Sequence, residues 1–278
     1  MKVLKSIAEL RGERASFTGL VGVVPTMGYL HQGHLALVRR ARQENDTLVV
    51  SIFVNPTQFG PQEDLQSYPR DLNRDLALLE EEKVDLVFVP TLEEMYPPSF
   101  DTYVDVGDID KRLEGKSRPG HFKGVATVVA KLFNIVEPTR AYFGQKDAQQ
   151  LLVIRRMVAD LNMNVEVVSV PTVREEDGLA VSSRNVYLSP EERCAATVLW
   201  RALSLAQKLW EGGERRGEAV REEMRTLIQR EPLATIDYVS VADPETLGEL
   251  GEVSGLALVS LAVRIGKTRL IDNITLNQ

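Results

Sequence analysis

Hydrophobic residues in the first 170 positions form short continuous runs that alternate with amphipathic stretches. Uninterrupted runs rich in β-branched residues are typical of strands buried on both faces of a parallel sheet. Apolar residues spaced three and four positions apart predict helices. The runs that predict strands cover residues 20–24, 47–54, 84–89, 141–143 and 165–170. The stretches that predict helices cover residues 2–14, 35–42, 71–82, 121–136 and 148–161.

This alternation predicts an α/β fold, with a Rossmann-like doubly wound parallel sheet formed by residues 1–170. In such sheets, ligands bind beyond the carboxyl ends of the strands, at the point where the strand order reverses. Three polar segments directly follow predicted strands, at residues 27–34, 55–59 and 144–147. We therefore expect these segments to line one ligand site.

The pattern changes after Pro171, where a polar loop spans residues 173–185. Ser189-Pro190-Glu191-Glu192 is a capping box with proline at the first helical position, and it predicts a helix that runs to about Trp210. A second helix and three strands follow, at residues 218–229, 236–242, 257–265 and 268–274, the last two strands joined by a Gly266-Lys267 turn. We expect a smaller C-terminal α+β domain over residues 171–278.

Composition narrows the class of protein. The formal charge is −7 over 278 residues, which argues against nucleic acid as the main partner. No apolar run has the ~20 residues of a membrane span, and the N-terminus does not resemble a signal peptide. The single cysteine, Cys194, cannot form an intrachain disulfide, which suits a cytoplasmic protein. We expect Cys194 to be a small, at least half-buried apolar side chain.

Two of the three histidines of the chain, His31 and His34, flank Gly33 where a helix is expected to begin. A strand, a glycine-containing turn and a helix N-terminus form an anion site, because the backbone N–H groups and the helix dipole face the ligand. The imidazoles would add hydrogen-bond donors for a phosphate. The alternatives are histidines that merely pack at a helix start, or metal ligands. No third ligand stands at a regular spacing, so the metal interpretation is weak.

Two further segments carry cations. Lys146, in Gly144-Gln145-Lys146-Asp147, could reach a nucleotide phosphate, and Asp147 could bind a ribose hydroxyl or a metal, although such pairs are commonly solvated. Arg184, in Ser182-Ser183-Arg184-Asn185, is suited to bidentate phosphate contact, although an ordinary polar linker has a similar composition.

Other segments suggest a pocket for a small polar substrate. Residues 55–59 offer two amides and an aromatic ring, one of Gln149 and Gln150 could turn inward, and residues 118–124 could form a wall. Asp71 and Asp75 could lie in one cleft, but a charged helix face explains them better.

Taken together, these motifs resemble the pantothenate synthetase (pantoate–β-alanine ligase) family over essentially the whole chain. The segments that carry the resemblance are PTMGYLHQGHLALV, FVNPTQFGPQEDLQSYPR, RPGHFKGV, YFGQKDAQQL and VREEDGLAVSSRNVYLS. The HxGH turn alone is shared with the wider nucleotidyltransferase and class I aminoacyl-tRNA synthetase superfamily.

The resemblance implies ATP-dependent condensation of pantoate with β-alanine through a pantoyl adenylate, with ATP accompanied by Mg²⁺. It implies catalytic roles for His34, His31, Lys146 and Arg184, and contacts to pantoate from Gln58 and Gln150. The residues that it implies around ATP are Met27, Gly28, Tyr29, Leu30, His31, Gln32, Gly33, His34, Gly144, Gln145, Lys146, Asp147, Val173, Val181, Ser182, Ser183 and Arg184. No metal ligand is carried over. Gln145 and Val181 depart from the residues common in the family, which are glutamate and methionine or leucine.

The resemblance also implies a homodimer, for which residues 47–54 or their neighbours could form the interface. Two other functions stay open from the residues alone. The HxGH turn would suit a nucleotidyltransferase acting on a phosphorylated alcohol, or a non-enzymatic adenine-nucleotide sensor. The amide-rich pocket argues against the first, and the combination of His31, His34 and Arg184 argues against the second.

Overall fold

The computed structural model describes residues 1–61 and 63–277. The chain divides into two compact units, each described here by itself. The first unit comprises Met1–Gln145 and Gln149–Pro171, and the second comprises Lys146–Ala148 and Thr172–Gln278. The main division follows Pro171, and a short segment around Lys146 groups with the second unit although its chain neighbours belong to the first.

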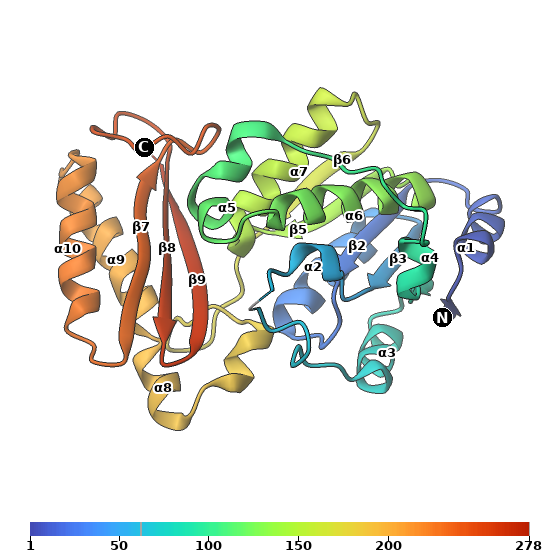
Figure 1. The fold of residues 1–278 in the computed structure, drawn as a ribbon, viewed down its shortest axis with the longest axis horizontal. Coiled ribbons are helices and arrows are strands. Elements are labelled where there is room, and N and C mark those ends of the chain that lie inside the picture. The colour runs from blue at the N-terminus through green and yellow to red at the C-terminus, as the bar shows by residue number, and fades with distance from the viewer. Residues whose placement is uncertain (62, 278) are drawn as a thin grey trace. The chain divides into compact units, whose positions relative to one another are not determined.

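The first unit is built on a six-stranded parallel sheet with strand order β1-β4-β3-β2-β5-β6 (Figure 1). Its strands are β1 (Lys2–Leu4), β2 (Val21–Thr26), β3 (Thr47–Ile52), β4 (Leu86–Phe88), β5 (Arg140–Gly144) and β6 (Glu166–Val170). Its helices are α1 (Ile7–Arg14), α2 (Gln32–Glu44), α3 (Leu72–Glu81), α4 (Leu92–Met95), α5 (Leu113–Ser117), α6 (His121–Val136) and α7 (Ala148–Asp160), with 3₁₀ turns η1 (Pro56–Gln58), η2 (Gly107–Lys111) and η3 (Gln145–Asp147). The predicted doubly wound sheet is confirmed.

Both faces of this sheet are buried, as the uninterrupted apolar runs predict. Val24 and Val50 pack in one core cluster with side chains of α2 and α3. Val23 and Val49 are equally buried but alternate with them, so they face the other side. Helix α6 is apolar nearly all round, which is typical of a helix enclosed by protein.

The strand order reverses between β2 and β5, which pair directly in parallel. The carboxyl ends of these two strands therefore lie at the same edge of the sheet. The predicted phosphate turn follows β2, and Gly144 ends β5. This arrangement places the start of both motifs at the topological switch point where such sheets bind ligands.

The prediction of one helix over residues 2–14 is wrong in its first part. Residues Lys2–Leu4 form β1, which pairs with β4 at the edge of the sheet. The helix begins only at Ile7, because Ser6 caps it and forms a reciprocal capping box with Glu9.

Two other expectations are corrected. Strand β3 cannot serve as an interface, because it lies inside the sheet between β2 and β4, and Leu48, Val49 and Val50 are fully buried. Cys194 is exposed rather than buried. It lies in α8 (Pro190–Ala195), a short helix whose buried residue is Ala195, one position further on.

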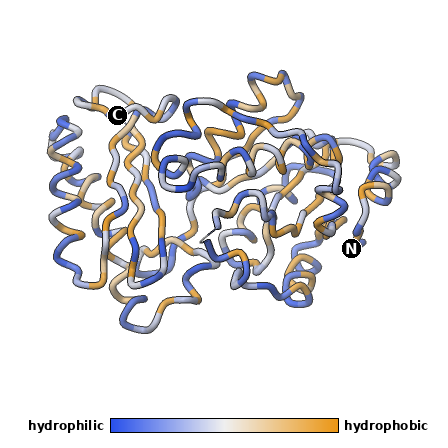
Figure 2. Tube along the Cα trace, viewed as in Figure 1, coloured by the Kyte–Doolittle hydropathy of each residue, from blue (hydrophilic) through white to orange (hydrophobic). Residues whose placement is uncertain are grey.

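The second unit packs helices on an antiparallel sheet of three strands, β7 (Ala234–Ala242), β8 (Ala257–Ile265) and β9 (Thr268–Leu276). Its helical segments are η4 (Ser183–Tyr187), α8, α9 (Val198–Glu211) and α10 (Gly217–Gln229). The core joins Trp210, Met224 and Leu261. Polar and apolar residues alternate along α10, as expected for a helix with one face on the core (Figure 2). The predicted turn at Gly266-Lys267 is confirmed, with φ of +55° at Gly266.

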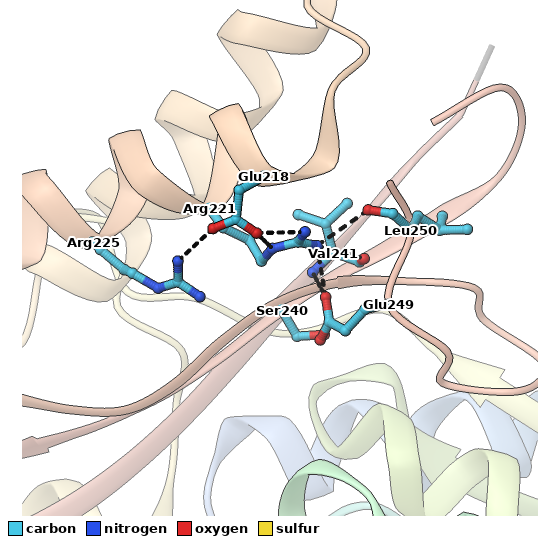
Figure 3. A network of polar contacts seen from close by, with 7 residues as sticks. All are labelled: Glu218, Arg221, Arg225, Ser240, Val241, Glu249 and Leu250. Atoms are coloured by element: carbon cyan, nitrogen blue, oxygen red, sulfur yellow. Dashed lines mark hydrogen bonds and ion pairs between the residues drawn. The ribbon is translucent and has the colours of Figure 1, made fainter. Parts of the chain in front are cut away.

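Arg221 of α10 (Gly217–Gln229) links this helix by hydrogen bonds to the end of β7 (Figure 3). Its side chain is 9% exposed, and its guanidinium donates to the carboxylates of Glu218 and Glu249 and to the carbonyls of Val241 and Leu250. A buried guanidinium needs such a set of acceptors, because the desolvation of an unpaired charge is costly.

Within residues 1–61 and 63–277, none of the helices combines the length and the apolar character that crossing a bilayer requires.

Candidate active site

His31 and His34 together form the N-terminal cap of α2. The His31 Nδ1 atom accepts a hydrogen bond from the Gly33 N–H (3.1 Å), and the His34 Nδ1 atom accepts one from the His31 N–H (3.4 Å). The two rings stack with centroids 3.9 Å apart. An imidazole whose Nδ1 accepts carries its proton on Nε2. Both rings therefore present Nε2–H donors at the positive end of a thirteen-residue helix.

Two Nε2–H donors at the positive end of a helix suit an anion such as phosphate. In the part of the chain that the structure describes, no group of three or more His, Cys, Asp or Glu side chains is placed to hold a metal. The Gly33 N–H, one of the backbone donors at the start of this helix, is engaged by the His31 ring. The hydrogen-bond donors at the start of α2 are therefore the two imidazole rings together with the other backbone N–H groups.

The turn before the histidines has an unusual backbone. Gly28 has φ of +81° and Tyr29 has φ of +51°, the left-handed region that is unfavourable for a residue with a side chain. The Asp75 carboxylate holds this turn, because it accepts hydrogen bonds from the N–H groups of Tyr29 and Leu30, both at 2.7 Å. The Arg74 guanidinium lies over the Tyr29 ring at 5.2 Å.

Asp75 supports the candidate site, although the sequence interpretation preferred a charged helix face to a place in a cleft. Asp71, exposed at the N-cap of α3, fits that expectation, but Asp75 is fully buried. Burial raises the pKa of the Asp75 carboxyl, although the Leu30 and Tyr29 N–H groups oppose the shift. A signal was available in the spacing: Asp75 stands four positions before Leu79, on the apolar side of α3.

Gln58 lies close to this turn. Its side-chain Nε2 is 3.2 Å from the Met27 sulfur, and its Oε1 accepts from the Asn55 amide at 3.1 Å. Asn55 also donates to the Gly124 carbonyl of α6. A Cβ atom at Gly124 would stand 2.4 Å from the Thr57 carbonyl oxygen, so only glycine permits this close approach of α6 to η1. The structure thus brings together the predicted segments after β2 and β3.

A series of hydrogen-bonded polar side chains also supports the backbone of Gln58. The His121 Nδ1–H donates to the Gln58 carbonyl (2.8 Å), and the His121 Nε2 accepts from Arg118 (3.0 Å). Arg118 in turn makes two 2.7 Å hydrogen bonds to Glu63. Burial and the Arg118 charge lower the pKa of His121 to about 4. The segment expected as a possible substrate wall therefore positions the backbone of Gln58.

Of the two glutamines on α7, Gln149 is structural. It is buried and bonds to the Glu114 N–H and to the carbonyls of Ile109 and Arg112, which fixes α5 and η2. Gln150, the one predicted to contact substrate, is half-buried. Gln145 is the last residue before Lys146 that belongs to the first unit. Its side-chain oxygen accepts a hydrogen bond from the Ser169 hydroxyl at 3.1 Å.

The remaining predicted ATP residues belong to the second unit. The Lys146 ammonium is 3.4 Å from an Asp147 carboxylate oxygen. Residues 173–181 form a hairpin rather than an irregular loop, closed by the Arg174–Ala180 bridge and by a hydrogen bond from the Val181 N–H to the Val173 carbonyl (3.0 Å). Ser182 then caps η4 through the Arg184 N–H.

The predicted site residues thus fall into two groups. The first unit brings together the Met27–His34 turn and Gln58, with Gly144 at the adjacent strand end. The second unit brings Lys146 and Asp147 into the same compact body as Val173 and residues 181–184.

Comparison with known proteins identifies the family of this chain. The family model described as pantoate-beta-alanine ligase matches residues 2–275. The chain belongs to the pantoate–β-alanine ligase family.

Curated members of this family match over almost their full length. Pantothenate synthetase from Roseiflexus sp. (strain RS-1) is 67% identical, with 99% of both chains covered. Pantothenate synthetase from Chloroflexus aurantiacus (strain ATCC 29366 / DSM 635 / J-10-fl) is 63% identical, with 98% of this chain and 97% of the relative covered.

Solved structures of the ligase family share the fold. Pantothenate synthetase from Thermus thermophilus superposes with a TM-score of 0.94 at 55% identity, covering 99% of both chains. Pantoate-beta-alanine ligase from Francisella tularensis, complexed with beta-gamma ATP and beta-alanine, superposes with a TM-score of 0.83 at 35% identity, covering 99% of this chain and 97% of that one.

Proposed function

We propose that this chain condenses (R)-pantoate with β-alanine to form pantothenate, at the expense of ATP. In the first half-reaction, the pantoate carboxylate attacks the α-phosphorus of ATP and pyrophosphate leaves. In the second, the β-alanine amine attacks the carbonyl carbon of the pantoyl adenylate, and AMP leaves. Membership of the ligase family supports the overall reaction, and the ligand pair of the Francisella relative supports ATP and β-alanine as substrates.

The paired imidazoles at the start of α2 carry the mechanistic part of the proposal. Negative charge grows on the α-phosphate as the carboxylate attacks. Preorganised donors that face this charge lower the barrier. His31 and His34 fulfil that role through Nε2–H, because their Nδ1 atoms are used by backbone N–H groups of the same turn. They act as donors to phosphate and not as general bases.

The other proposed substrate contacts come from residues of both units. Gln58 and Gln150 would bind pantoate, and Met27 to His34 would border ATP together with Gly144 and Gln145. Lys146 would meet the phosphates and Asp147 the ribose, while Val173 and residues 181–184 would contact the nucleotide. Charge neutralisation and positioning, rather than covalent chemistry by the protein, supply most of the catalysis in such transfers.

Mg²⁺ would arrive with ATP. The described residues lack a cluster of three metal-ligating side chains, which suits an ion held mainly by the phosphate oxygens of the nucleotide. Bound there, it would neutralise phosphate charge.

Pantoate-dependent exchange of radioactive pyrophosphate into ATP, measured without β-alanine, tests the proposal. We expect exchange that requires pantoate, because adenylation is reversible and precedes the amine. Absence of exchange in a preparation that still forms pantothenate would exclude the adenylate. Nucleotide transfer to a phosphorylated alcohol, or ATP binding with no turnover, would identify the nucleotidyltransferase or the sensor instead.

The histidine roles are tested by His34→Ala. Loss of the donor should lower the exchange rate by about a hundredfold or more, with the far-UV circular dichroism unchanged. A variant with wild-type exchange would refute the catalytic role of His34.

The homodimer and the cytoplasmic location also remain proposals that rest on the family. Light scattering on the purified chain tests the first, and a mass near twice 31.0 kDa is expected. Fractionation of the source cells tests the second.

A further inference from the structure

Lys146 is attached to the second unit by a side chain from its last strand. The Asn273 amide of β9 donates to the Lys146 carbonyl at 2.8 Å, and Asn273 is only 5% exposed. Residues on either side of Lys146–Ala148 in the chain belong to the first unit. A buried side chain on β9 therefore holds the backbone of the one residue in this turn that carries a cation.

The preceding residue of β9 holds a different segment. Asp272, 2% exposed, makes a bidentate pair with the Arg174 guanidinium at 2.6 and 2.9 Å. Arg174 also lies over the Trp200 ring at 4.0 Å and donates to the Asn273 carbonyl. Successive residues of a strand point to opposite faces. From opposite faces of β9, Asp272 thus binds the segment that contains Arg174, and Asn273 binds the segment that contains Lys146.

Arg174 belongs to the hairpin that leads to Arg184. Its bridge with Ala180 closes the hairpin, and the Asn185 amide donates to the Ala180 carbonyl at 3.1 Å. The backbone from Arg174 through Arg184 is therefore linked by internal hydrogen bonds, and the Arg174–Asp272 ion pair attaches it to β9. The two cations proposed for the phosphates, Lys146 and Arg184, are thus both held in place through adjacent residues of β9.

We propose that Asp272 and Asn273 are positioning residues, which fix Lys146 and the Arg184 loop in one register for the phosphates of ATP. This inference rests on the proposed function, because it assumes that both cations meet the same nucleotide. Misplacement of a charged group by about 1 Å can cost about a hundredfold in rate. Asparagine suits position 273, since the carbonyl of Lys146 requires a donor and an aspartate would oppose it with negative charge.

A double-mutant cycle tests the action of Asn273 through Lys146. We expect Asn273→Ala to lower kcat of pantoate-dependent exchange by about ten- to a hundredfold, with little change in KM for pantoate. In a Lys146→Ala background, the same substitution should change kcat by less than about threefold. Equal losses in both backgrounds would mean a general structural role and would overturn the proposal.

The corresponding cycle for Asp272 pairs Asp272→Asn with Arg184→Ala, and the same non-additivity is expected. Thr275→Ala is the matched control, because Thr275 is an exposed residue on the same face of β9 as Asn273. It should leave kcat unchanged. If Asn273→Ala melts below the assay temperature, Asn273→Asp, which has nearly the same shape, takes its place.

Hydrogen–deuterium exchange separates this inference from the proposed function, because it requires no turnover. We expect faster exchange across residues 146–150 in Asn273→Ala and across residues 173–181 in Asp272→Asn, and no change in Thr275→Ala. Deuterium exchange at the wild-type rate in both variants would refute the positioning role, whatever reaction the enzyme catalyses. Failure of wild-type protein to support pyrophosphate exchange, with the deuterium pattern as expected, would refute only the proposed reaction.

Discussion

At the scale of single residues, Asp75 shows where residue type and role diverge. Aspartate is normally solvated, and composition alone therefore predicts a surface position. In the structure, the helix period carries it to the buried side of α3, where its carboxylate replaces the water that the N–H groups of Tyr29 and Leu30 would otherwise need. By contrast, His31 and His34 could be located from sequence, because a glycine turn after a strand limits where a helix can begin.

Asp75→Asn is expected to destabilise the fold and to slow adenylation. An amide can direct only one acceptor atom at the two N–H groups, so its NH₂ faces a donor, which costs about 1–3 kcal/mol. Urea denaturation measures the first effect, and pyrophosphate exchange on the folded variant measures the second. Asp71→Asn is the matched control, because asparagine caps a helix as well as aspartate does. Equal behaviour of the two variants would contradict the role of Asp75.

His121 gives a pH dependence whose sign follows from its burial. Its pKa is about 4 in the folded chain, against 6.5 when solvated. Between these values the unfolded chain binds the extra proton, so stability should fall as the pH drops from about 6.5 to about 4, by on the order of 3 kcal/mol. The groups that face His121 are Arg118, Glu63 and Glu114.

Denaturation of wild type and His121→Gln at several pH values tests this dependence. The variant should be less stable at pH 7, because it loses a buried hydrogen bond, but its stability should fall less as the pH is lowered. Parallel curves for the two proteins would show that His121 is not the group responsible.

At the scale of elements, the parallel strands β2 to β6 were predictable because each contains an apolar run, whereas β1 was taken for part of a helix. The ends of elements were harder to predict. Residues 2–4 and 7–14 share an apolar pattern, and only the Ser6 cap separates strand from helix. The hairpin of residues 173–181 was predicted as a loop, because its ordering depends on Arg174 reaching a distant acceptor, Asp272. Side-chain contacts across about a hundred positions leave no periodic signal in a sequence.

Arg221 is expected to contribute more to stability than any other arginine of its network (Figure 3). Arg221→Ala should destabilise the protein by about 3 kcal/mol, since it leaves Glu249 and the carbonyls of Val241 and Leu250 without their shared donor. Arg225→Ala, which removes a more exposed pair with Glu218, should cost less than about 1 kcal/mol. Thermal and urea unfolding measure both, and similar losses would contradict the importance of burial.

At the scale of the whole molecule, the proposed nucleotide contacts are divided between the two units. The first unit contributes the Met27–His34 turn, and the second contributes Lys146 and the Val181–Arg184 segment. Sequence motifs indicated both groups, since each follows a strand or lies in a polar segment. The attachment of Lys146 to the second unit could not be predicted, because its neighbours in the chain form the first unit's own β5 and α7.

This division predicts that ATP with pantoate will stabilise both units together. A ligand that binds only the folded protein stabilises it by about 2.7 kcal/mol at a hundred times its dissociation constant. We therefore expect a melting temperature that rises with ATP concentration. We also expect slower proteolysis within residues 173–185, because a nucleotide held by Val173 and Arg184 would shield that segment. Arg184→Ala should reduce both effects while leaving the melting temperature of the unliganded protein nearly unchanged. If saturating ATP and pantoate left proteolysis of this segment unaltered, the nucleotide would be held by the first unit alone, and the proposed role of the second would fail.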